Sequence, residues 1–325
     1  MTKLLVLEEK SVFERHAPAE LREFCDITLL NQFTPAGEIL AQAPDADVLL
    51  VNPTITVGAE LINGLPNLKM IQSEGVGFEG VDLAAADARG IYVCNCRGVN
   101  ARAVAEHTVM LMLCCLRDVI NGYSDVLEGR QNEKKVWTMK TGSLRELGDC
   151  TVGFVGYGAI GREAARLTKA FGARTLYYKP HPGDEDYAEY CSLDELLRQS
   201  DIVSLNLPLT AETENMADRE FFARMKKGAI FINTARGGLV NSADLLDAVA
   251  SGQLGCVGLD VLDHEPVQTD HILVAAPEAV RRKIIFTPHI AGVSAGAFER
   301  TYKIILENIR RVQSGGRPVN VVNRV

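Results

Sequence analysis

Three short segments carry side chains that can bind a carboxylate and move a proton. They are residues 233–241, which contain Arg236, residues 260–266, which contain Glu265, and residues 287–292, which contain His289. A guanidinium can hold a carboxylate through two parallel hydrogen bonds, which a lysine cannot do. A histidine can give a proton to a carbonyl oxygen and take it back, and a neighbouring glutamate favours its charged form. This combination suits the reduction of a 2-oxo acid.

A glycine-rich turn indicates a nucleotide-binding site earlier in the chain. Residues 151–155 are an apolar run that leads directly into Gly156, Gly158 and Gly161, in G-x-G-x-x-G spacing, before a helical pattern. The first glycine permits the turn, the second lets the backbone approach a pyrophosphate, and the third lets the helix lie close to the sheet. The N–H groups that begin the helix would face the phosphates. We expect a dinucleotide here; the alternative is a glycine turn without a ligand.

The next strand ends without the carboxylate that NAD-binding domains commonly place there. Residues 175–178 are followed by Lys179, 18 residues after Gly161, and then by His181. An Asp or Glu at this point accepts hydrogen bonds from the ribose hydroxyls of NAD, whereas a lysine can pair with the 2′-phosphate of NADP. We expect NAD or NADP as cofactor, with a slight preference for NADP. A solvated lysine beside bound NAD is the alternative.

Short apolar runs alternate with helix-length segments through most of the chain. The expected strands are residues 4–7, 27–30, 48–51, 68–71 and 91–93, followed by 151–155, 175–178, 202–205, 229–233, 256–259 and 284–286. Helices are expected between them, for example at 37–43 and 83–88. This alternation is typical of α/β folds with parallel sheets. Because parallel strands share one carboxyl edge, the segments with Arg236, Glu265 and His289 should open onto one ligand crevice.

Two long helices and one irregular stretch complete the pattern. Apolar residues recur at helical spacing in residues 102–116 and again in residues 295–313, so each segment predicts a helix with one buried face. Residues 122–149 are polar and irregular, and we expect them to form an excursion from the core. The sequence contains no repeat at solenoid spacing and no low-complexity tract.

Composition and charge narrow the range of partners. The 325 residues suffice for two domains, and the fractions of hydrophobic (47%) and charged (23%) residues are those of a globular protein. A net charge of −8, without a run of lysine or arginine, argues against nucleic acid or an anionic membrane as partner. No apolar stretch is long enough to span a membrane, and the first residues do not resemble a signal peptide. We therefore expect a cytoplasmic location.

The eight cysteines do not form a metal-binding pattern. Cys94 and Cys96 are one residue apart, and Cys114 and Cys115 are adjacent. Zinc sites commonly need pairs separated by two residues, followed by a second Cys or His pair. We expect buried, reduced thiols that act as small apolar side chains, and no metal site.

The order of these motifs resembles that of the D-specific 2-hydroxyacid dehydrogenases. In chain order, the shared runs are Gly75-Val76-Gly77 with Val81-Asp82, Asn100-Ala101, Ala105-Glu106-His107-Thr108, the glycine fingerprint, Leu207-Pro208-Leu209-Thr210 with Glu214, Met225-Lys226-Lys227-Gly228-Ala229, A-R-G-G at 235–238, D-V-x-x-x-E-P at 260–266 and T-P-H-I-A at 287–291. Apart from about the first sixty residues, which match only in pattern, the resemblance covers the chain.

The resemblance implies a fold and a domain order. It implies a Rossmann-type, doubly wound parallel sheet in a dinucleotide-binding domain at residues 100–292. This domain would be inserted into a smaller flavodoxin-like α/β substrate-binding domain made of residues 1–99 and 293–325. Residues 122–149, with the only tryptophan, Trp137, resemble the arm through which this family dimerises. A homodimer is therefore expected.

The resemblance also implies an activity and the residues that perform it. The activity would be hydride transfer between NAD(P)H and a small 2-oxo acid, of glyoxylate, hydroxypyruvate or another type, giving an (R)-2-hydroxy acid. Arg236, Glu265 and His289 would be catalytic, and Gly75, Val76 and Gly77 would bind the substrate together with Arg236. Val76 and Thr108 would reach the nicotinamide from the other domain. The remaining expected cofactor contacts are Gly156, Gly158, Ala159, Ile160, Gly161, Lys179, Leu207, Pro208, Thr213, Thr234, Ala235, Arg236, Asp260 and His289.

Two residues of the expected substrate loop depart from the family pattern. Glu74 stands where small residues are usual, and Gly80 where asparagine is common. A carboxylate at the mouth of the site would repel anionic substrates or prefer a substrate with a basic group. We expect instead that Glu74 points to solvent.

Three other side chains compete for a role in the site. His264 is adjacent to Glu265, but His289 has the motif context of the acid/base. His107 lies on a predicted helix and is expected to be structural. Arg102, at the start of that helix, faces the crevice or caps a carbonyl group.

Two other functions fit parts of the same pattern. Formate dehydrogenase belongs to the same structural family, but it needs no general acid, and the Glu265–His289 pair is suited to proton transfer. A dinucleotide-sensing binding protein, like the C-terminal-binding co-repressors that share this fold, retains the triad but usually has flexible tails. The sequence lacks such tails, so 2-oxo acid reduction is the favoured function.

Overall fold

The chain folds into two compact α/β units. The computed structural model describes residues 1–183 and 185–325. Unit 1 consists of Met1–Asn100 and Val293–Val325, and unit 2 consists of Ala101–Gly292. Each unit has its own sheet with parallel neighbouring strands, so the predicted α/β class is confirmed.

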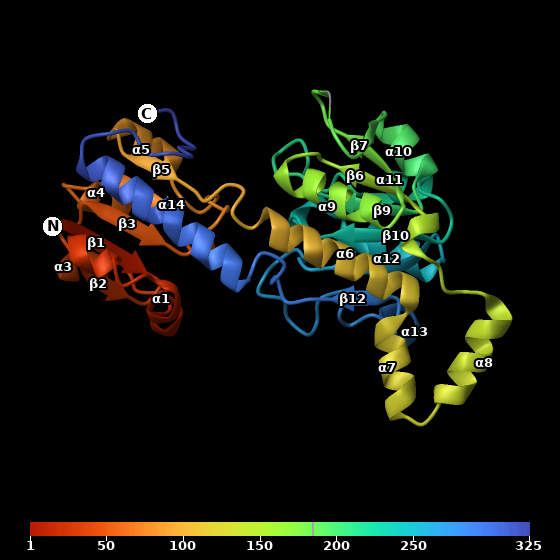
Figure 1. Ribbon diagram of the computed structural model, residues 1–325. Helices are drawn as coiled ribbons and strands as arrows, with labels where there is room; N and C mark the ends of the chain where they lie inside the picture. The colour runs from red at the N-terminus through yellow and green to blue at the C-terminus, as the bar shows by residue number, and fades with distance from the viewer. Residues whose placement is uncertain (184) are drawn as a thin grey trace. The chain divides into compact units, whose positions relative to one another are not determined.

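Unit 1 is built on a five-stranded sheet in the order β2-β1-β3-β4-β5 (Figure 1). Its strands are β1 (Thr2–Leu7), β2 (Cys25–Leu30), β3 (Val48–Val51), β4 (Met70–Ser73) and β5 (Tyr92–Cys94). Every residue of β3 is buried, as expected of a parallel strand that is covered on both faces. This is the flavodoxin-like order, in which the chain reverses direction across the sheet between β1 and β3.

Helices cover both faces of this sheet. They are α1 (Lys10–His16), α2 (Leu21–Phe24), α3 (Ala36–Gln42), α4 (Ala59–Gly64), α5 (Leu83–Ala88) and α14 (Ala295–Gln313). Leu5 and Leu49 pack on the face that α3, α4 and α5 cover, whereas Leu4 and Leu50 pack on the face that α1 and α14 cover. Neighbouring residues therefore alternate between the two faces, as the strand geometry requires.

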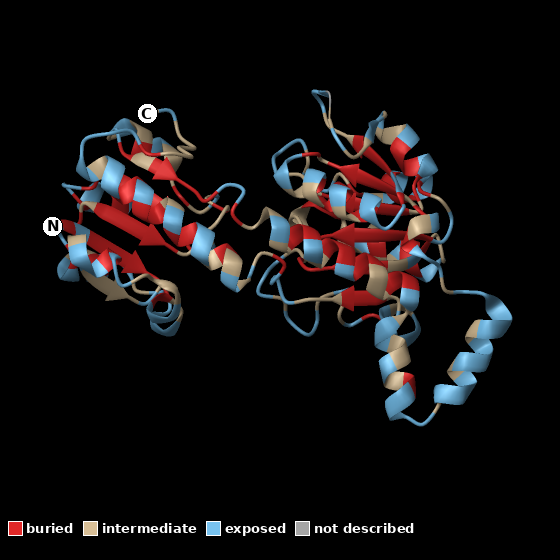
Figure 2. Cartoon of the chain, viewed as in Figure 1, coloured by how far each residue is buried: buried red, intermediate tan, exposed pale blue. Residues whose placement is uncertain are grey.

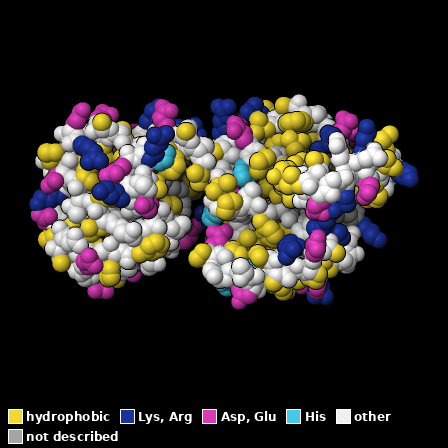
Figure 3. Space-filling view, turned by 90° about the horizontal axis from the view of Figure 1, so that it is seen from below, with side chains coloured by type: hydrophobic (Ala, Val, Ile, Leu, Met, Phe, Trp, Pro, Cys, Tyr) yellow, Lys and Arg dark blue, Asp and Glu magenta, His cyan; other side chains and the backbone are white. Residues whose placement is uncertain are grey.

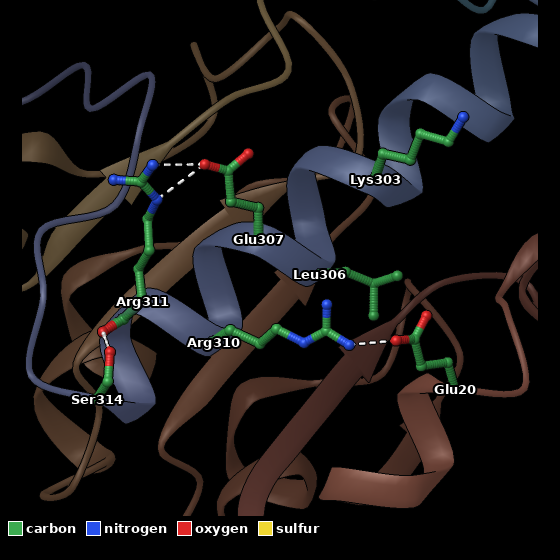
Figure 4. A pocket seen from close by; sticks show the side chains of 7 residues that line it. All are labelled: Glu20, Lys303, Leu306, Glu307, Arg310, Arg311 and Ser314. Atoms are coloured by element: carbon green, nitrogen blue, oxygen red, sulfur yellow. Dashed lines mark hydrogen bonds and ion pairs between the residues drawn. The ribbon is translucent and has the colours of Figure 1, made fainter.

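A shallow groove on unit 1 runs beside α14 (Figure 4). It is lined by Glu20, Lys303, Leu306, Glu307, Arg310, Arg311 and Ser314. Arg310 pairs with Glu20, and Arg311 donates a hydrogen bond from Nε to Glu307 at 2.9 Å. Because both arginines are engaged in exposed ion pairs, one to Glu20 before α2 and one within α14, we assign the groove no ligand.

Unit 2 is built on a seven-stranded sheet in the order β12-β11-β10-β9-β6-β7-β8. Its strands are β6 (Thr151–Val155), β7 (Arg174–Tyr178), β8 (Glu189–Tyr190), β9 (Ile202–Leu205), β10 (Ala229–Asn233), β11 (Leu254–Leu259) and β12 (Ile284–Phe286). The strand order reverses between β6 and β9. In open α/β sheets, ligands bind at the carboxyl ends of the strands on either side of such a reversal.

Helices also cover both faces of the second sheet. They are α6 (Ala101–Arg117), α9 (Ala159–Ala170), α10 (Leu193–Gln199), α11 (Arg219–Arg224), α12 (Ser242–Ala250) and α13 (Glu278–Arg281), with short 3₁₀ turns η1 (Leu147–Asp149) and η2 (Gly237–Leu239). Phe154 and Ile232 pack against α6 and α9, while Val155 and Phe231 pack on the face of α10, α11 and α12 (Figure 2). Because both faces of the sheet are buried under helices, the carboxyl ends of its strands are held in place.

The prediction that residues 122–149 are irregular was wrong. The segment begins inside α7 (Val119–Leu127) and continues through α8 (Gln131–Thr141), and the two helices project from unit 2 as an arm (Figure 1). We name α7 and α8, residues 119–141, the arm. None of the residues of α8 is buried, so the sequence shows no apolar stripe from which the helix could be recognised.

Charged side chains stabilise the arm in place of a core. Asp125 of α7 is buried and pairs with Arg130 at 2.7 Å, and Lys134 of α8 pairs with Asp118. Arg282, beyond α13, donates a hydrogen bond to Asn121 at 3.0 Å. These contacts join α7 to α8 and the arm to the body of unit 2.

Smaller differences concern the ends and number of elements. The predicted strand at 68–71 is found at Met70–Ser73, because Leu68 lies in a turn that its N–H closes onto Leu65. Helices α1, α2 and α4 and the short strand β8 were not predicted. α1 buries only Phe13 and α2 only Leu21, so neither has a repeated apolar position from which a helix could be recognised.

Candidate active site

The loops that follow the strands of unit 2 gather the predicted functional residues at one edge of the sheet. Gly156 follows β6, Asn206 follows β9, Thr234 follows β10, Asp260 follows β11, and Thr287 follows β12. All neighbouring strands are parallel, so these residues lie at the same carboxyl edge. The parallel topology therefore places the segments with Arg236, Glu265 and His289 at one edge of the sheet, as the sequence predicts.

The glycine turn has the geometry that a bound pyrophosphate needs. Gly156 has a φ of +91°, and a Cβ atom there would lie 2.5 Å from the carbonyl oxygen of Asn206. A Cβ at Gly161 would lie 2.5 Å from the carbonyl oxygen of Gly156, so the helix can approach only without a side chain. A Cβ at Gly158 would meet nothing within 4 Å, and no side chain caps α9 there. The residues present therefore leave space and free N–H groups for a phosphate.

Asn206 is a polar residue of this edge that the sequence reasoning missed. Both polar atoms of its side-chain amide are buried and have no hydrogen-bond partner among the described residues. Its Cβ lies 3.5 Å from the position that a Cβ of Gly161 would take. The signal in the sequence was its position as the first residue after the strand 202–205. A buried amide without a partner beside a phosphate-sized space fits a site that receives a polar ligand.

Lys179 is already engaged within unit 2. Its ammonium group pairs with Glu185 and lies 5.8 Å from the centre of the Tyr177 ring. A 2′-phosphate would have to compete with the Glu185 carboxylate for this charge. The position at the end of β7 is as expected, but the lysine is not the solvated side chain of the alternative interpretation.

Threonine hydroxyl groups form hydrogen bonds at the loops that follow β9 and β10. Thr213 donates a hydrogen bond to the carbonyl oxygen of Pro208 at 2.8 Å and fixes the loop after β9. Thr108 of α6 lies 2.8 Å from Thr234, hydroxyl to hydroxyl. Thr108 therefore belongs to the same unit as the glycine turn, and the expectation that it comes from the other domain was wrong.

Glu265 and His289 form a hydrogen-bonded pair. Nδ1 of His289 lies 2.6 Å from Oε2 of Glu265, and Oε1 of Glu265 accepts a hydrogen bond from the N–H of Leu262 at 3.0 Å. The backbone of His289 has a φ of +54°, and its N–H donates to the carbonyl oxygen of Asp260 at 2.8 Å. The ring orientation is thus set from both the side chain and the backbone.

The pair shifts the acidity of both groups. The hydrogen bond that Nδ1 of His289 donates to Glu265 raises the pKa of His289 above its ordinary value, and the charges of Glu265 and Asp260 add to the effect, against burial and the charge of Arg236. Burial acts to raise the pKa of Glu265, but hydrogen bonds from His289 and Leu262 outweigh it, so that pKa lies below its ordinary value. The arrangement therefore favours an imidazolium beside a carboxylate.

Arg236 lies on the neighbouring loop. Its carbonyl oxygen accepts a hydrogen bond from Asn233 at 2.8 Å, and its guanidinium donates one to the carbonyl oxygen of Ala235 at 2.8 Å. A Cβ at the next residue, Gly237, would lie 1.9 Å from the carbonyl carbon of Leu262. Only glycine permits this close approach, which brings the Arg236 loop against the loop that carries Glu265.

Asp260 is a structural anchor of the histidine loop. Its carboxylate is buried and accepts hydrogen bonds from the hydroxyl of Thr287 at 2.6 Å, from the N–H of Ile290 at 3.0 Å and from the N–H of Ala291 at 2.8 Å. The carboxylate is thus used to shape the turn around His289. Asp260 stays a predicted cofactor contact, and its carboxylate is engaged by the histidine loop.

The competing side chains take no part in the pair. The side chain of His264 is 91% exposed and lies 3.7 Å from Asp263. His107 is half-buried, its Nε2 lies 2.9 Å from the hydroxyl of Thr287, and burial lowers its pKa, so it supports the histidine loop as a structural residue. Arg102 pairs with Glu106 on its own helix at 2.8 Å, and among the described residues its side chain donates no hydrogen bond to a carbonyl group; that it faces the crevice stays a prediction.

Unit 1 holds the predicted substrate loop after β4. All three carbonyl oxygens of residues 75–77 accept a hydrogen bond. The donor to Gly75 is the Cys96 N–H at 2.7 Å, the donor to Val76 is the Asn95 amide at 2.8 Å, and the donor to Gly77 is the Ser73 hydroxyl at 2.6 Å. The N–H groups of Val76 and Gly77 donate no hydrogen bond within residues 1–183 and 185–325. A loop with fixed carbonyls and available N–H groups is suited to an anion.

Both departures in this loop have structural explanations. A Cβ at Gly80 would lie 2.2 Å from the carbonyl oxygen of Ile55, so no asparagine fits there. Glu74 does not point to solvent as expected: it is only 8% exposed, and its carboxyl group is enclosed within unit 1.

Cysteines and metal ligands add nothing to the site. All eight cysteines are free thiols, and Cys25, Cys94, Cys96, Cys115 and Cys150 are buried. No cluster of three or more potential metal ligands occurs among the described residues. Nor does any helix in that part of the chain have the length and apolar character needed to cross a membrane.

Comparison with known proteins places the chain in a family. Residues 109–291 match the family described as D-isomer specific 2-hydroxyacid dehydrogenase, NAD binding domain. The hydroxypyruvate reductase of Thermotoga maritima is 35% identical over 291 residues, which cover 87% of this chain and 90% of that protein. The chain belongs to the D-isomer specific 2-hydroxyacid dehydrogenases.

Other members of the family agree over the full length. The glycerate dehydrogenase of Methylorubrum extorquens is 34% identical over 327 residues and covers 99% of both chains. The crystal structure of D-lactate dehydrogenase with NAD⁺ from Lactobacillus jensenii has a TM-score of 0.84 at 27% identity and covers 99% of this chain. As a D-2-hydroxyacid dehydrogenase, the chain is an oxidoreductase that uses a nicotinamide cofactor and acts on the CH–OH group of its donors. The predicted family and enzyme class are confirmed.

The pairing of Glu265 with His289 predicts how activity depends on pH. In Glu265→Gln the hydrogen bond and charge that raise the pKa of His289 are lost, so that pKa should fall. Reduction requires the imidazolium, so the alkaline limb of kcat/KM should move to lower pH. Steady-state rates of 2-oxo acid reduction across the pH range measure this shift.

The matched control is Glu278→Gln, which removes an exposed carboxylate of α13 and should leave the profile in place. His289→Ala should lower the rate by about 10²- to 10⁴-fold, the usual range for loss of a general acid–base group. A Glu265→Gln profile that coincides with the wild-type profile would contradict the pairing.

Proposed function

We propose that the chain reduces a small 2-oxo acid, of the glyoxylate or hydroxypyruvate type, to the (R)-2-hydroxy acid, with Arg236, Glu265 and His289 as its catalytic residues. The observation that carries this proposal is the 2.6 Å contact between His289 and Glu265. The loop of Glu265 packs, in turn, against the loop of Arg236. The reduction of a 2-oxo acid needs a proton donor, a carboxylate that orients this donor, and a guanidinium that binds the substrate carboxylate. The relatives named hydroxypyruvate reductase and glycerate dehydrogenase support this choice of substrate class.

Each catalytic side chain has a distinct task. Arg236 binds the substrate carboxylate in two-point geometry and places its positive charge beside the carbonyl group. Nδ1 of His289 is engaged by Glu265, so Nε2 donates the proton to the carbonyl oxygen and recovers it in the reverse reaction. Glu265 keeps the ring protonated and oriented. A reduced nicotinamide, when bound, supplies the hydride for the carbonyl carbon.

Unit 2 is the proposed dinucleotide-binding domain. The open space at Gly158 and the first N–H groups of α9 would hold the pyrophosphate. The other cofactor contacts that we propose are Gly156, Ala159, Ile160, Gly161, Lys179, Leu207, Pro208, Thr213, Thr234, Ala235, Arg236, Asp260, His289, Thr108 and, from unit 1, Val76. A metal ion has no part in the proposal.

Unit 1 is the proposed substrate-binding domain. The N–H groups of Val76 and Gly77 are available as donors, and the fixed carbonyls of residues 75–77 keep the loop in shape. With Gly75 and Arg236, they would bind the carboxylate of the 2-oxo acid. The proposed domain bounds are residues 1–99 with 293–325 for the substrate and 100–292 for the cofactor.

We also propose that the chain forms a homodimer through the arm. Large apolar side chains of the arm are exposed: Val119, Ile120, Tyr123, Val126, Leu127, Val136, Trp137 and Met139. Figure 3, seen from the side to which the arm projects, shows hydrophobic side chains gathered on this face of unit 2. A self-complementary contact between two arms would cover them. The proposed location is the cytoplasm, in keeping with the net charge of −8 and the free thiols.

Arg236→Lys tests the carboxylate clamp. Lysine keeps the charge but loses the planar, two-point geometry, so we expect a much lower kcat/KM with little change in cofactor affinity. The measurement is NAD(P)H absorbance with glyoxylate, hydroxypyruvate, pyruvate, aromatic 2-oxo acids and, in the reverse direction, formate.

Arg219→Lys is the matched control, because Arg219 is exposed and pairs with Asp244 and Asp247 of α12, none of which is a proposed site residue. It should behave as the wild type. Near-normal reduction by Arg236→Lys would overturn the role of Arg236, and turnover of formate without turnover of any 2-oxo acid would overturn the proposed function.

Lys179→Asp tests the proposed slight preference for NADP. Lysine can pair with the 2′-phosphate, but Glu185 competes for it. The wild type should therefore favour NADPH only modestly, by about tenfold or less, since a partly exposed ion pair contributes about 1 kcal/mol. The aspartate should reverse the preference, because it repels the 2′-phosphate and accepts hydrogen bonds from the ribose hydroxyls.

The measurement is kcat/KM for NADH and NADPH at one saturating 2-oxo acid. Lys169→Asp, an exposed charge change at the end of α9, is the control and should leave the ratio unchanged. A wild type that prefers NADH several-fold, together with no gain in Lys179→Asp, would show that Lys179 does not select the cofactor.

A further inference from the structure

Glu74 is a buried acid at the start of the substrate loop. Its N–H donates to the carbonyl oxygen of Val51 at 2.8 Å and extends the pairing of β4 with β3 by one residue. The next residue, Gly75, begins the loop that offers its N–H groups to a carboxylate. The Glu74 side chain is only 8% exposed, and neither carboxyl oxygen has a hydrogen-bond partner among the described residues. An ionised carboxylate without hydrogen bonds is costly in such a place.

The groups that surround the Glu74 carboxyl offer it no positive charge. Glu8 faces it from the end of β1, Tyr302 from α14 and Cys96 from the segment after β5. None of the three is a cation. Glu8 is also buried, and its two oxygens accept hydrogen bonds from the Glu9 N–H at 2.7 Å and from the Asn52 amide at 2.8 Å. Of the two neighbouring acids, Glu8 therefore accepts two short hydrogen bonds, whereas the donor near Glu74 is the hydroxyl of Tyr302, which forms no hydrogen bond of normal geometry with it.

The titration of Glu74 follows from these surroundings. Burial raises its pKa to about 8, the charge of Glu8 adds to the effect, and the nearby hydroxyl of Tyr302 opposes it. Burial raises the pKa of the Cys96 thiol to about 12, so this thiol remains neutral when Glu74 loses its proton. At neutral pH, Glu74 is thus mainly a carboxylic acid.

We propose that Glu74 is a positioning residue that holds the substrate loop in its binding conformation as an uncharged carboxylic acid. The inference rests on the proposed function, in which residues 75–77 bind the carboxylate of the 2-oxo acid. Loss of the proton would place a second negative charge beside Glu8 and two residues before Val76, the first residue with an available N–H group in that loop. The ionised side chain would be driven out of its enclosure, and the loop would bind an anion less well. Glu74 thereby adds a proton requirement to substrate binding that is separate from the requirement of His289.

The pH profile of Glu74→Gln tests this inference. If both His289 and Glu74 must be protonated, log kcat/KM of the wild type should fall with a slope approaching about −2 at high pH. Glutamine keeps the size and polarity of the neutral acid but has no proton to lose. We expect near-normal kcat/KM at neutral pH and an alkaline slope of about −1, from His289 alone.

Tyr302→Phe is the matched control. It removes the hydroxyl that favours the ionised form of Glu74 but keeps the acid, so the slope should remain near −2 and the second break should move to higher pH. This variant also tests the inference if Glu74→Gln fails to fold. A readout independent of turnover is the infrared carbonyl band of a protonated carboxylic acid, which should disappear as the pH rises through about 8 in the wild type and be absent from Glu74→Gln.

The outcomes separate this inference from the proposed function. A wild type that reduces 2-oxo acids, with the same alkaline slope in Glu74→Gln, would overturn the role of Glu74 and leave the proposed function intact. A second break that does not move in Tyr302→Phe would also overturn that role. A wild type that reduces no 2-oxo acid would overturn the proposed function and, with it, the inference, even if the infrared band were found.

Discussion

The contact between His289 and Glu265 depends on two loops that follow neighbouring strands and must be held within hydrogen-bonding distance. Asp260 holds one side, because its carboxylate binds Thr287 and two N–H groups of the histidine loop. The other side depends on Gly237, whose missing side chain lets the Arg236 loop pack against Leu262. The parallel sheet brings these loops to one edge, but these short-range contacts set the distances that proton transfer needs.

Two acids of this protein, Glu265 and Glu74, show how the surroundings of a carboxyl group decide its role. Glu265 accepts hydrogen bonds from His289 and from an N–H group, and its pKa lies below the ordinary value despite burial. Glu74 is enclosed beside Glu8, and burial raises its pKa to about 8 against the effect of the Tyr302 hydroxyl. Near neutral pH the first acid is therefore a carboxylate that stabilises an imidazolium, and the second is a neutral acid.

Much of the fold could be predicted from the sequence, because buried parallel strands are apolar on both faces and stand out as short runs. Strands 202–205, 229–233 and 284–286 were predicted with the bounds that the structure has. Helix α8 could not be predicted from apolar periodicity, since it buries no side chain and is held by ion pairs. The catalytic motifs could be found because few residue types perform proton transfer. The burial of the Glu74 side chain could not be predicted, since the groups that enclose it include Glu8 and Tyr302, which are distant in sequence.

The most direct test of the central claim is the protonation state of His289 in the free protein. Nitrogen NMR of ¹⁵N-labelled histidine, with the His289 signals assigned by their loss in His289→Ala, gives the pKa of the ring over about pH 5 to 9. The account predicts a pKa above the ordinary value of about 6.5, with the Nδ1 proton held in a hydrogen bond throughout. A pKa at or below that value, or an Nδ1 without a bound proton in the neutral ring, would contradict the claim that Glu265 prepares His289 as the acid.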